Sequence, residues 1–125
     1  MRNTVMLAAT LLVALITATA GHARSAYAPG NENLAVATFA GGCFWCVEEG
    51  FEKIPGVVEA VSGYSGGKET NPSYEQVSAG QTGHTEAVQV YYDPAVITYE
   101  GLVEGFWRFV DPTDSAGQFV DRGRQ

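Results

Sequence analysis

The sequence predicts an α/β protein of the α+β type, built as a two-layer sandwich with helices on one face of a mixed or antiparallel sheet. Short apolar runs alternate with segments of helical spacing, and turn residues separate the two kinds of segment. The 125 residues are enough for one domain. With 46% apolar and 17% charged residues, the composition is that of a globular protein. The formal charge of −7 argues against a nucleic-acid partner, because phosphate binding requires a basic patch.

Three elements are expected in the first half of the domain. Leu34–Ala40 is a short apolar run, which predicts a strand buried on both faces. Cys43–Ile54 has apolar residues near helical spacing and ends before a Pro-Gly pair, so it predicts a helix. Val57–Tyr64 predicts a second strand, and the turn-rich residues 65–73 predict the loop that follows it.

The second half adds a short helix, a strand and a longer helix. Tyr74–Ala79 is expected to form one or two helical turns. Thr85–Tyr92 is the clearest strand of the chain and ends at an Asp-Pro pair. Thr98–Val110 carries an apolar stripe that recurs at the spacing of one helix face, and Thr98 is its expected N-cap. Residues 111–125 are polar and predict a coil.

The predicted order of elements is strand, helix, strand, short helix, strand, helix. A ferredoxin-like sandwich is built on a split βαβ unit and has one more strand after its last helix. We therefore expect a ferredoxin-like fold whose final strand is missing. The absent strand would leave the edge at Leu34–Ala40 unpaired, so the chain alone is expected to be poorly stable.

The N-terminal residues predict an exported protein, periplasmic or secreted. Residues 1–23 have the pattern of a signal peptide, in which Arg2 is followed by an uncharged apolar run and by small residues up to Ala23. Residues 24–33 predict a flexible leader, and residues 34–125 the folded domain. A membrane anchor is disfavoured, because the run is short for a span of about 20 residues. No stable membrane association is expected after cleavage.

Cys43 and Cys46 form a C-x-x-C pair directly after two glycines, at the expected start of the first helix. The free N–H groups and the positive end of a helix stabilise a thiolate there. Cys46 lies one turn later, within reach for a disulfide, so the pair suits a nucleophile and a resolving thiol. An inert structural disulfide is the open alternative. A zinc site is disfavoured, because zinc needs four ligands, or three and water, and only His22 and His84 could add to the thiols; no metal is expected.

Glu86 is the second candidate for chemistry. It falls on the same face of its predicted strand as Val88, Val90 and Tyr92. Burial among apolar side chains raises the pKa of a carboxyl toward neutrality, and a protonated carboxyl is a useful general acid. The alternative interpretation places Glu86 at the mouth of the strand, where it is solvated or caps a turn.

Several strings of this sequence together resemble the methionine sulfoxide reductase A family, the peptide-methionine (S)-S-oxide reductases. The most specific pair is GGCFW, which contains Cys43, followed downstream by GHTEAV, which contains Glu86. The matching strings run in family order from Thr38 to Gly123: TFAGGCFWCVE, PGV, SGYSGG, NPSYEQV, GHTEAV, YDP and the DP…DRG tail. Composition and periodicity alone do not identify this family.

The resemblance implies thiol-dependent reduction of methionine S-sulfoxide, free or in proteins, to methionine, which repairs oxidative damage. In that mechanism Cys43 is the nucleophile and becomes a sulfenic acid, Glu86 protonates the sulfoxide oxygen, and Cys46 resolves the sulfenic acid as a disulfide. The resemblance also assigns four substrate-binding residues: Phe44 and Trp45 as walls of a methyl pocket, Tyr74 as a hydrogen-bond donor to the sulfoxide oxygen, and Asp121 as an orienting carboxylate.

The resemblance implies no bound cofactor, and an external thiol reductant such as thioredoxin or dithiothreitol; a monomer is expected. Some family members carry a resolving cysteine near the position of Val120, which is valine here. The family continues beyond the DRG string into a Tyr-Arg-Ser segment and a strand, so we expect this chain to be weakly active and an added C-terminal segment to restore sulfoxide reduction. Two alternatives remain: a thioredoxin-like dithiol–disulfide oxidoreductase, and an inactive fragment with a structural thiol pair.

Overall fold

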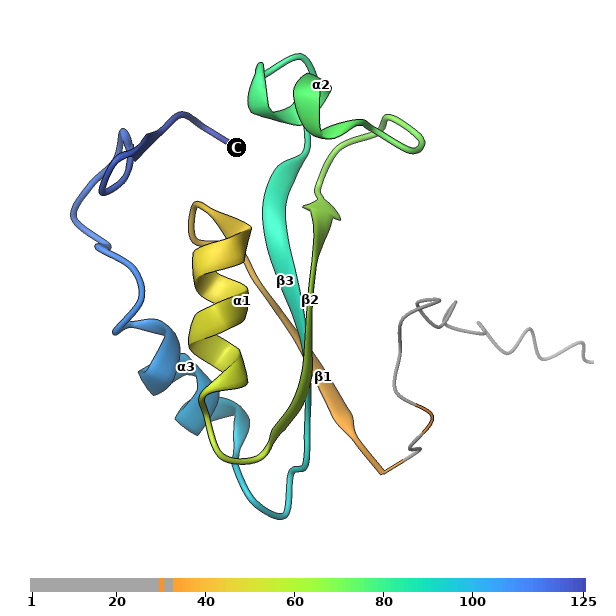
Figure 1. Cartoon of the computed structure of the whole chain (residues 1–125), viewed down its shortest axis with the longest axis vertical. Helices are drawn as coiled ribbons and strands as arrows, with labels where there is room; N and C mark the ends of the chain where they lie inside the picture. Colours follow the sequence, from red (N-terminus) through yellow and green to blue (C-terminus); the bar gives the residue numbers. More distant parts are fainter. Residues whose placement is uncertain (1–29, 31–32) are drawn as a thin grey trace, which may run out of the picture.

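The computed structural model describes Gly30 and residues 33–125. The predicted signal peptide (1–23) and nearly all of the predicted leader (24–33) lie outside the described residues. Within the described part of the chain, no helix is both long and apolar enough to cross a lipid bilayer. The elements follow in this order (Figure 1): β1 (Ala35–Phe39), α1 (Phe44–Glu52), β2 (Val57–Ser65), α2 (Tyr74–Ser78), β3 (Thr85–Tyr92), α3 (Tyr99–Phe106), β4 (Gly117–Gln118) and β5 (Asp121–Arg122).

The strand β3 lies in the middle of a three-stranded sheet of order β1-β3-β2 and is antiparallel to both neighbours. β1 and β2 are therefore parallel to each other, and α1 connects them, which is the split βαβ arrangement. The register places Phe39 opposite Val88 and Tyr64 opposite Glu86. The predicted two-layer fold with an antiparallel sheet is confirmed for the described residues.

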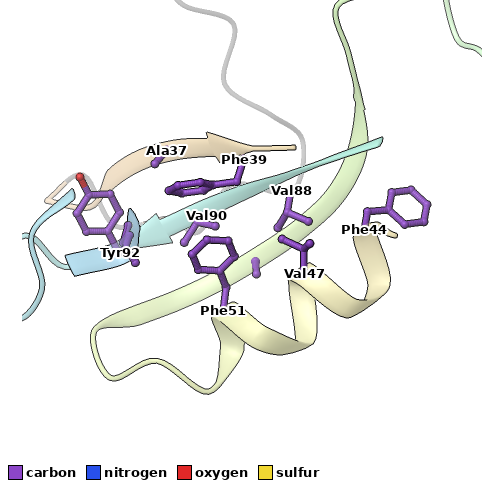
Figure 2. Close-up of a cluster of buried hydrophobic side chains, with 10 residues drawn as sticks. Ala37, Phe39, Phe44, Val47, Phe51, Val88, Val90 and Tyr92 are labelled. Atoms are coloured by element: carbon purple, nitrogen blue, oxygen red, sulfur yellow. The ribbon is translucent and has the colours of Figure 1, made fainter. Parts of the chain in front are cut away.

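The core forms where α1 and α3 pack on one face of the sheet, and Figure 2 shows the part of it between α1 and the strands. Val88 and Val90 are two positions apart on β3, so their side chains share the sheet face that is covered by the helices. Both are fully buried. From α1, Val47 and Phe51 lie one turn apart and pack against them, and the Phe51 ring centroid is 4.6 Å from that of Phe39. The other buried members of the cluster are Ala37, Phe44, Ala60, Tyr92 and Leu102.

The expectation that the first strand is buried on both faces is wrong. In β1 only Ala37 and Phe39 are buried, whereas Val36 on the opposite face is 51% exposed. Helices cover one face of this sheet, so alternate residues of β1 face outward even though the run is apolar. A short run of apolar residues does not by itself distinguish a strand that is covered on one face from one covered on both.

The predicted helix 98–110 starts as expected and ends early. Thr98 is the N-cap, and its hydroxyl oxygen accepts a hydrogen bond from the N–H of Gly101 at 3.1 Å. The helix stops at Phe106, and the following N–H of Phe109 donates back three residues to Phe106 at 2.9 Å. This tighter turn brings Phe109 edge-on to the core, while Trp107, a member of the predicted stripe, is 55% exposed.

The predicted coil after the last helix contains a small hairpin. Its strands β4 and β5 pair Gly117 with Arg122 and Gln118 with Asp121. The segment runs from α3 back toward the beginning of α1 and the start of β3 (Figure 1). The backbone N–H of Glu86 donates to the carbonyl of Gln125 at 3.0 Å, which attaches the segment to β3. The hairpin thus carries Asp121 to the sheet end where Glu86 lies.

Candidate active site

The chain enters α1 through two glycines that place Cys43 at the helix start. Gly42 has a φ of +87°, a backbone conformation that a residue with a side chain rarely adopts. A Cβ atom at Gly41 would come within 2.8 Å of side-chain atoms of Phe106 and Val110, so the loop packs tightly on the end of the core. Cys43 is the N-cap, and its carbonyl accepts the N–H of Val47 at 3.2 Å. Its side chain therefore starts at the N-terminal end of α1.

Glu86 occupies the beginning of β3 and is 5% exposed, which agrees with the buried one of the two interpretations that the sequence left open. Its Oε2 atom accepts the N–H of Phe44, in the first turn of α1, at 2.9 Å. Burial raises the pKa of Glu86 above its ordinary value, the Phe44 hydrogen bond partly offsets that effect, and the Asp121 carboxylate raises the pKa further. Its low exposure shows that the solvated alternative for Glu86 is wrong, whereas the bond to the Phe44 N–H does cap the first turn of α1.

Three groups from separate parts of the chain meet at this point. The Cys43 sulfur, a Glu86 carboxylate oxygen and an Asp121 carboxylate oxygen all lie within 4.8 Å of one another. Asp121 is half-buried on the hairpin, and an ion pair between Arg122 Nη1 and Asp114 Oδ2, 2.6 Å apart, holds that hairpin against the preceding loop. A thiolate and two carboxylates can also act as ligands to a divalent cation, although zinc would need a fourth ligand. A thiol and two carboxyl groups this close suit proton transfer at the sulfur.

Cys46 lies on the next turn of α1 and is exposed, and both cysteines are free thiols. A hydrogen bond with Cys43 is the main cause that raises the pKa of Cys46, and its partial burial adds to the effect. Negative charge on Cys43, Glu49 and Asp121 raises it further. Cys46 is thus held as a neutral thiol within hydrogen-bond reach of the Cys43 sulfur.

An aromatic group surrounds the start of α1. The ring centroid of Phe44 lies 5.4 Å from Trp45, 5.7 Å from Tyr64 and 6.2 Å from Tyr74. Trp45 and Tyr74 stack on each other with centroids 5.6 Å apart, and they are 60% and 43% exposed. Phe44 is buried beneath them, so the group offers an apolar, solvent-accessible surface next to the thiol.

All seven residues predicted for the site lie in this region. Cys43, Glu86 and Asp121 meet at the start of α1, Cys46 lies one turn along the helix, and the aromatic group contains Phe44, Trp45 and Tyr74. Tyr64 is a member that the sequence did not single out as a site residue. Burial and the nearby Glu86 carboxylate raise the pKa of its hydroxyl. Tyr64 could have been found only from the pairing of β2 with β3, because it lies directly opposite Glu86 in the register. That pairing is a tertiary fact and is not visible in either strand alone.

A family model and two curated relatives each match most of this chain. A family model described as peptide methionine sulfoxide reductase matches residues 35–125. The peptide methionine sulfoxide reductase MsrA of Listeria monocytogenes serotype 4a is 60% identical over 93 residues, which cover 74% of this chain and 52% of that protein. The MsrA/MsrB protein of Vibrio cholerae is 56% identical over 95 residues, which cover 76% of this chain and 25% of that protein. The chain thus spans about half the length of the Listeria relative.

Two solved structures share the fold. Methionine sulfoxide reductase A of Corynebacterium diphtheriae matches with a TM-score of 0.70 and 37% identity, over 75% of this chain and 44% of that one. Mxr1 from Saccharomyces cerevisiae in its reduced form matches with a TM-score of 0.67 and 36% identity, over 73% of this chain and 55% of that one.

Proposed function

The chain belongs to the peptide methionine sulfoxide reductase family, and from this we propose that it reduces methionine S-sulfoxide, free or in proteins, to methionine. The observation that carries the proposal is the meeting of the Cys43 sulfur with the Glu86 and Asp121 carboxylates within 4.8 Å, at the start of a helix. A sulfoxide oxygen leaves sulfur only when it is protonated. A nucleophilic sulfur and a protonated carboxyl are therefore needed together.

Cys43 is the proposed nucleophile and Glu86 the proposed acid. The Cys43 thiolate attacks the sulfoxide sulfur while the Glu86 carboxyl gives its proton to the sulfoxide oxygen. The attack forms a transient bond between the two sulfur atoms. The hydroxyl then moves to the Cys43 sulfur as that sulfur–sulfur bond and the sulfur–oxygen bond of the substrate both break, which leaves Cys43 as a sulfenic acid and the substrate as a thioether. In sum, one thiol and one sulfoxide become one sulfenic acid and one thioether, so Cys43 is oxidised by two electrons and methionine sulfoxide is reduced by two.

The physical basis of this pair is the different surroundings of the two groups. Cys43 is the N-cap of α1, so its side chain starts at the helix end that carries the positive partial charge. Glu86 is buried next to Asp121, which raises its pKa. A carboxyl with a raised pKa beside a nucleophilic sulfur is suited to give a proton during the attack.

The proposed substrate contacts follow from the aromatic group. Phe44 and Trp45 offer apolar surface for the methyl group of the substrate, and Tyr74, which stacks on Trp45, is the proposed hydrogen-bond donor to the sulfoxide oxygen. Asp121 orients the substrate or an active-site water. Trp45 and Tyr74 are both exposed enough for a methionine side chain to approach from solvent.

Regeneration is proposed to use Cys46 and an external thiol, with no bound cofactor. The Cys46 thiol condenses with the Cys43 sulfenic acid, forming a disulfide and releasing one water. A dithiol such as thioredoxin or dithiothreitol then reduces the disulfide. The hydrogen bond that joins the two thiols supports this route. Export to an oxidising compartment and a monomeric state remain parts of the proposal.

Separate assays of the two sulfoxide epimers test the function. Purified protein is incubated with dithiothreitol and either the S- or the R-epimer of methionine sulfoxide, and methionine is quantified. We expect turnover of the S-epimer and little or none of the R-epimer. Reduction of a generic protein disulfide without turnover of either epimer would favour the thioredoxin-like alternative and contradict the proposal.

A serine at position 46 should separate the two half-reactions. Cys46→Ser keeps the Cys43 sulfur and the Glu86 acid, so the first oxygen transfer should proceed at a rate within about twofold of wild type. We expect about one methionine per protein and then a stall when thioredoxin is the reductant, measured by quenched-flow methionine release. Multiple turnovers with thioredoxin at the wild-type rate would show that Cys46 does not resolve.

A further inference from the structure

Residues 66–84 form an excursion between β2 and β3, and this excursion carries Tyr74 (Figure 1). The last sheet pair before it is Ser65 with Thr85. The two chain segments that lead into and out of the excursion are its stems. Beyond the pair of Ser65 with Thr85, no strand ladder joins these stems. α2 lies at the far end, and Tyr74 is its first residue. The position of the Tyr74 ring over Trp45 therefore depends on how the stems of the excursion are closed.

His84 closes these stems with both of its ring nitrogens. Its Nδ1 atom accepts the backbone N–H of Gly67 at 3.3 Å. Its Nε2 atom lies 2.9 Å from the backbone carbonyl of Glu69, to which it donates when Nε2 carries the proton. A neutral imidazole with its proton on Nε2 satisfies both contacts at once. His84 thus joins the two stems by hydrogen bonds at the point where the strand ladder ends.

The contact around His84 is close-packed and reinforced by Glu69. A Cβ atom added at Gly67 would lie 2.2 Å from the imidazole ring, so that position accepts no side chain while the ring is in place. The Glu69 carboxylate accepts the N–H of Gly83 at 3.3 Å from the opposite stem. It also accepts the N–H of Lys68 at 3.1 Å and lies 3.8 Å from His84 Nε2. We call His84, Gly67 and Glu69 the stem clamp.

We propose that His84 is a positioning residue that holds Tyr74 in its place beside Trp45, a role that rests on the proposed sulfoxide reduction. α2 itself is ordered by its own capping box, because Ser73 and Gln76 exchange hydrogen bonds at 2.9 and 3.3 Å. The clamp is therefore not needed to form α2. It sets where α2, and with it the Tyr74 hydroxyl, lies relative to the thiol.

Kinetics of His84→Ala and Tyr74→Phe, alone and combined, test this role. Each single variant should lower kcat/KM for the S-sulfoxide by about tenfold, the effect of losing one hydrogen bond to the transition state. Because His84 acts through the Tyr74 hydroxyl, adding His84→Ala to Tyr74→Phe should cost less than a further twofold. A double variant about a hundredfold below wild type would mean independent effects and would overturn the proposal.

Conservative variants separate the two clamp bonds. The side-chain amide of glutamine can place its N–H near the Nε2 position, and asparagine can place its oxygen near Nδ1. The Nε2 contact is shorter, 2.9 against 3.3 Å, so His84→Gln should recover more activity than His84→Asn. Thr70→Ala, in the same loop and exposed, is the matched control and should keep wild-type kinetics. Activity of His84→Gln as low as that of His84→Ala would contradict the clamp.

An optical readout keeps this test separate from the proposed function. With Trp107→Phe as background, Trp45 is the sole tryptophan, and its near-UV circular dichroism reports its stacking on Tyr74. His84→Ala should change that signal in the same direction as Tyr74→Leu. An unchanged signal overturns the clamp whether or not the protein reduces sulfoxides. A changed signal in a protein without sulfoxide turnover supports the clamp and contradicts the proposed function alone.

Discussion

Replacing Cys43 by serine is expected to lower kcat/KM for methionine sulfoxide by at least about a thousandfold while the fold stays intact. A serine hydroxyl is a weak nucleophile near neutral pH and cannot carry the transferred oxygen as a sulfenic acid. The fold should survive because Cys43 is the N-cap of α1 and its side chain makes no capping hydrogen bond. Serine is a preferred N-cap residue, so the helix start should be equally or more stable.

Two measurements check this result together. Methionine release from the S-sulfoxide gives the activity, and urea unfolding gives the free energy of unfolding, which should be unchanged or higher by up to about 1 kcal/mol. Cys46→Ser is the matched control, since it also removes one thiol from α1 but should still release one equivalent of methionine. If Cys43→Ser kept activity within tenfold of wild type, Cys43 would not be the nucleophile.

Glu86→Gln is expected to lower kcat/KM by about a hundredfold or more, because glutamine has no acidic proton to give to the sulfoxide oxygen. The side-chain carbonyl of glutamine can still accept the Phe44 N–H, so the contact with α1 is kept. Glu104→Gln makes the same chemical change at an exposed position of α3 and should leave the kinetics unchanged. Near wild-type activity of Glu86→Gln would exclude Glu86 as the acid.

The pH dependence of the wild-type protein should follow from the raised pKa of Glu86. The active form has this carboxyl protonated, so kcat/KM should fall as the pH rises through its raised pKa. Glu86→Gln should lack this descending limb, while Glu104→Gln should keep it. Profiles of kcat/KM against pH for the three proteins decide the point, and an unchanged alkaline limb in Glu86→Gln would assign it to another group.

The raised pKa of Glu86 also makes the free energy of unfolding depend on pH. The pKa of Glu86 is raised by folding, so the native state holds more protons than the unfolded state at pH values between the ordinary value of 4.5 and the raised one. The free energy of unfolding should therefore decrease as the pH rises through that window. Glu86→Gln should be more stable than wild type at neutral pH, a gain in stability that accompanies the loss of activity. Equal urea midpoints at neutral pH would contradict the burial argument.

The sequence predicted best those elements whose signals are local. The strand Thr85–Tyr92 has the predicted bounds, because its alternation and the Asp-Pro pair after it lie within ten residues. The Thr98 cap is confirmed for the same reason, as a cap depends on the next three residues. The end of α3 was missed because a turn at Phe109, which packs on Phe51 of α1, overrides the helical stripe.

The site residues likewise divide into those that local sequence patterns indicated and those that only the tertiary structure revealed. The C-x-x-C pair at a helix start and a glutamate among apolar strand residues were visible as patterns, but only the structure decided that Glu86 is buried and not solvated. The interest in Tyr74 and Asp121 came from the family resemblance, since neither position has a local pattern that marks chemistry. Tyr64 and the His84 clamp were missed, because each acts through a residue on another segment.

By itself the sequence determined the types of the main elements, the thiol pair at a helix start and the family, since these depend on neighbours along the chain or on whole strings. Only the tertiary structure decided that a hairpin near the C-terminal end carries Asp121 to within 4.8 Å of Cys43 and Glu86. It also decided which face of β1 is covered. The physical reason is that the proton affinity of a carboxyl depends on the charges and solvent around it in space, and sequence separation says little about either.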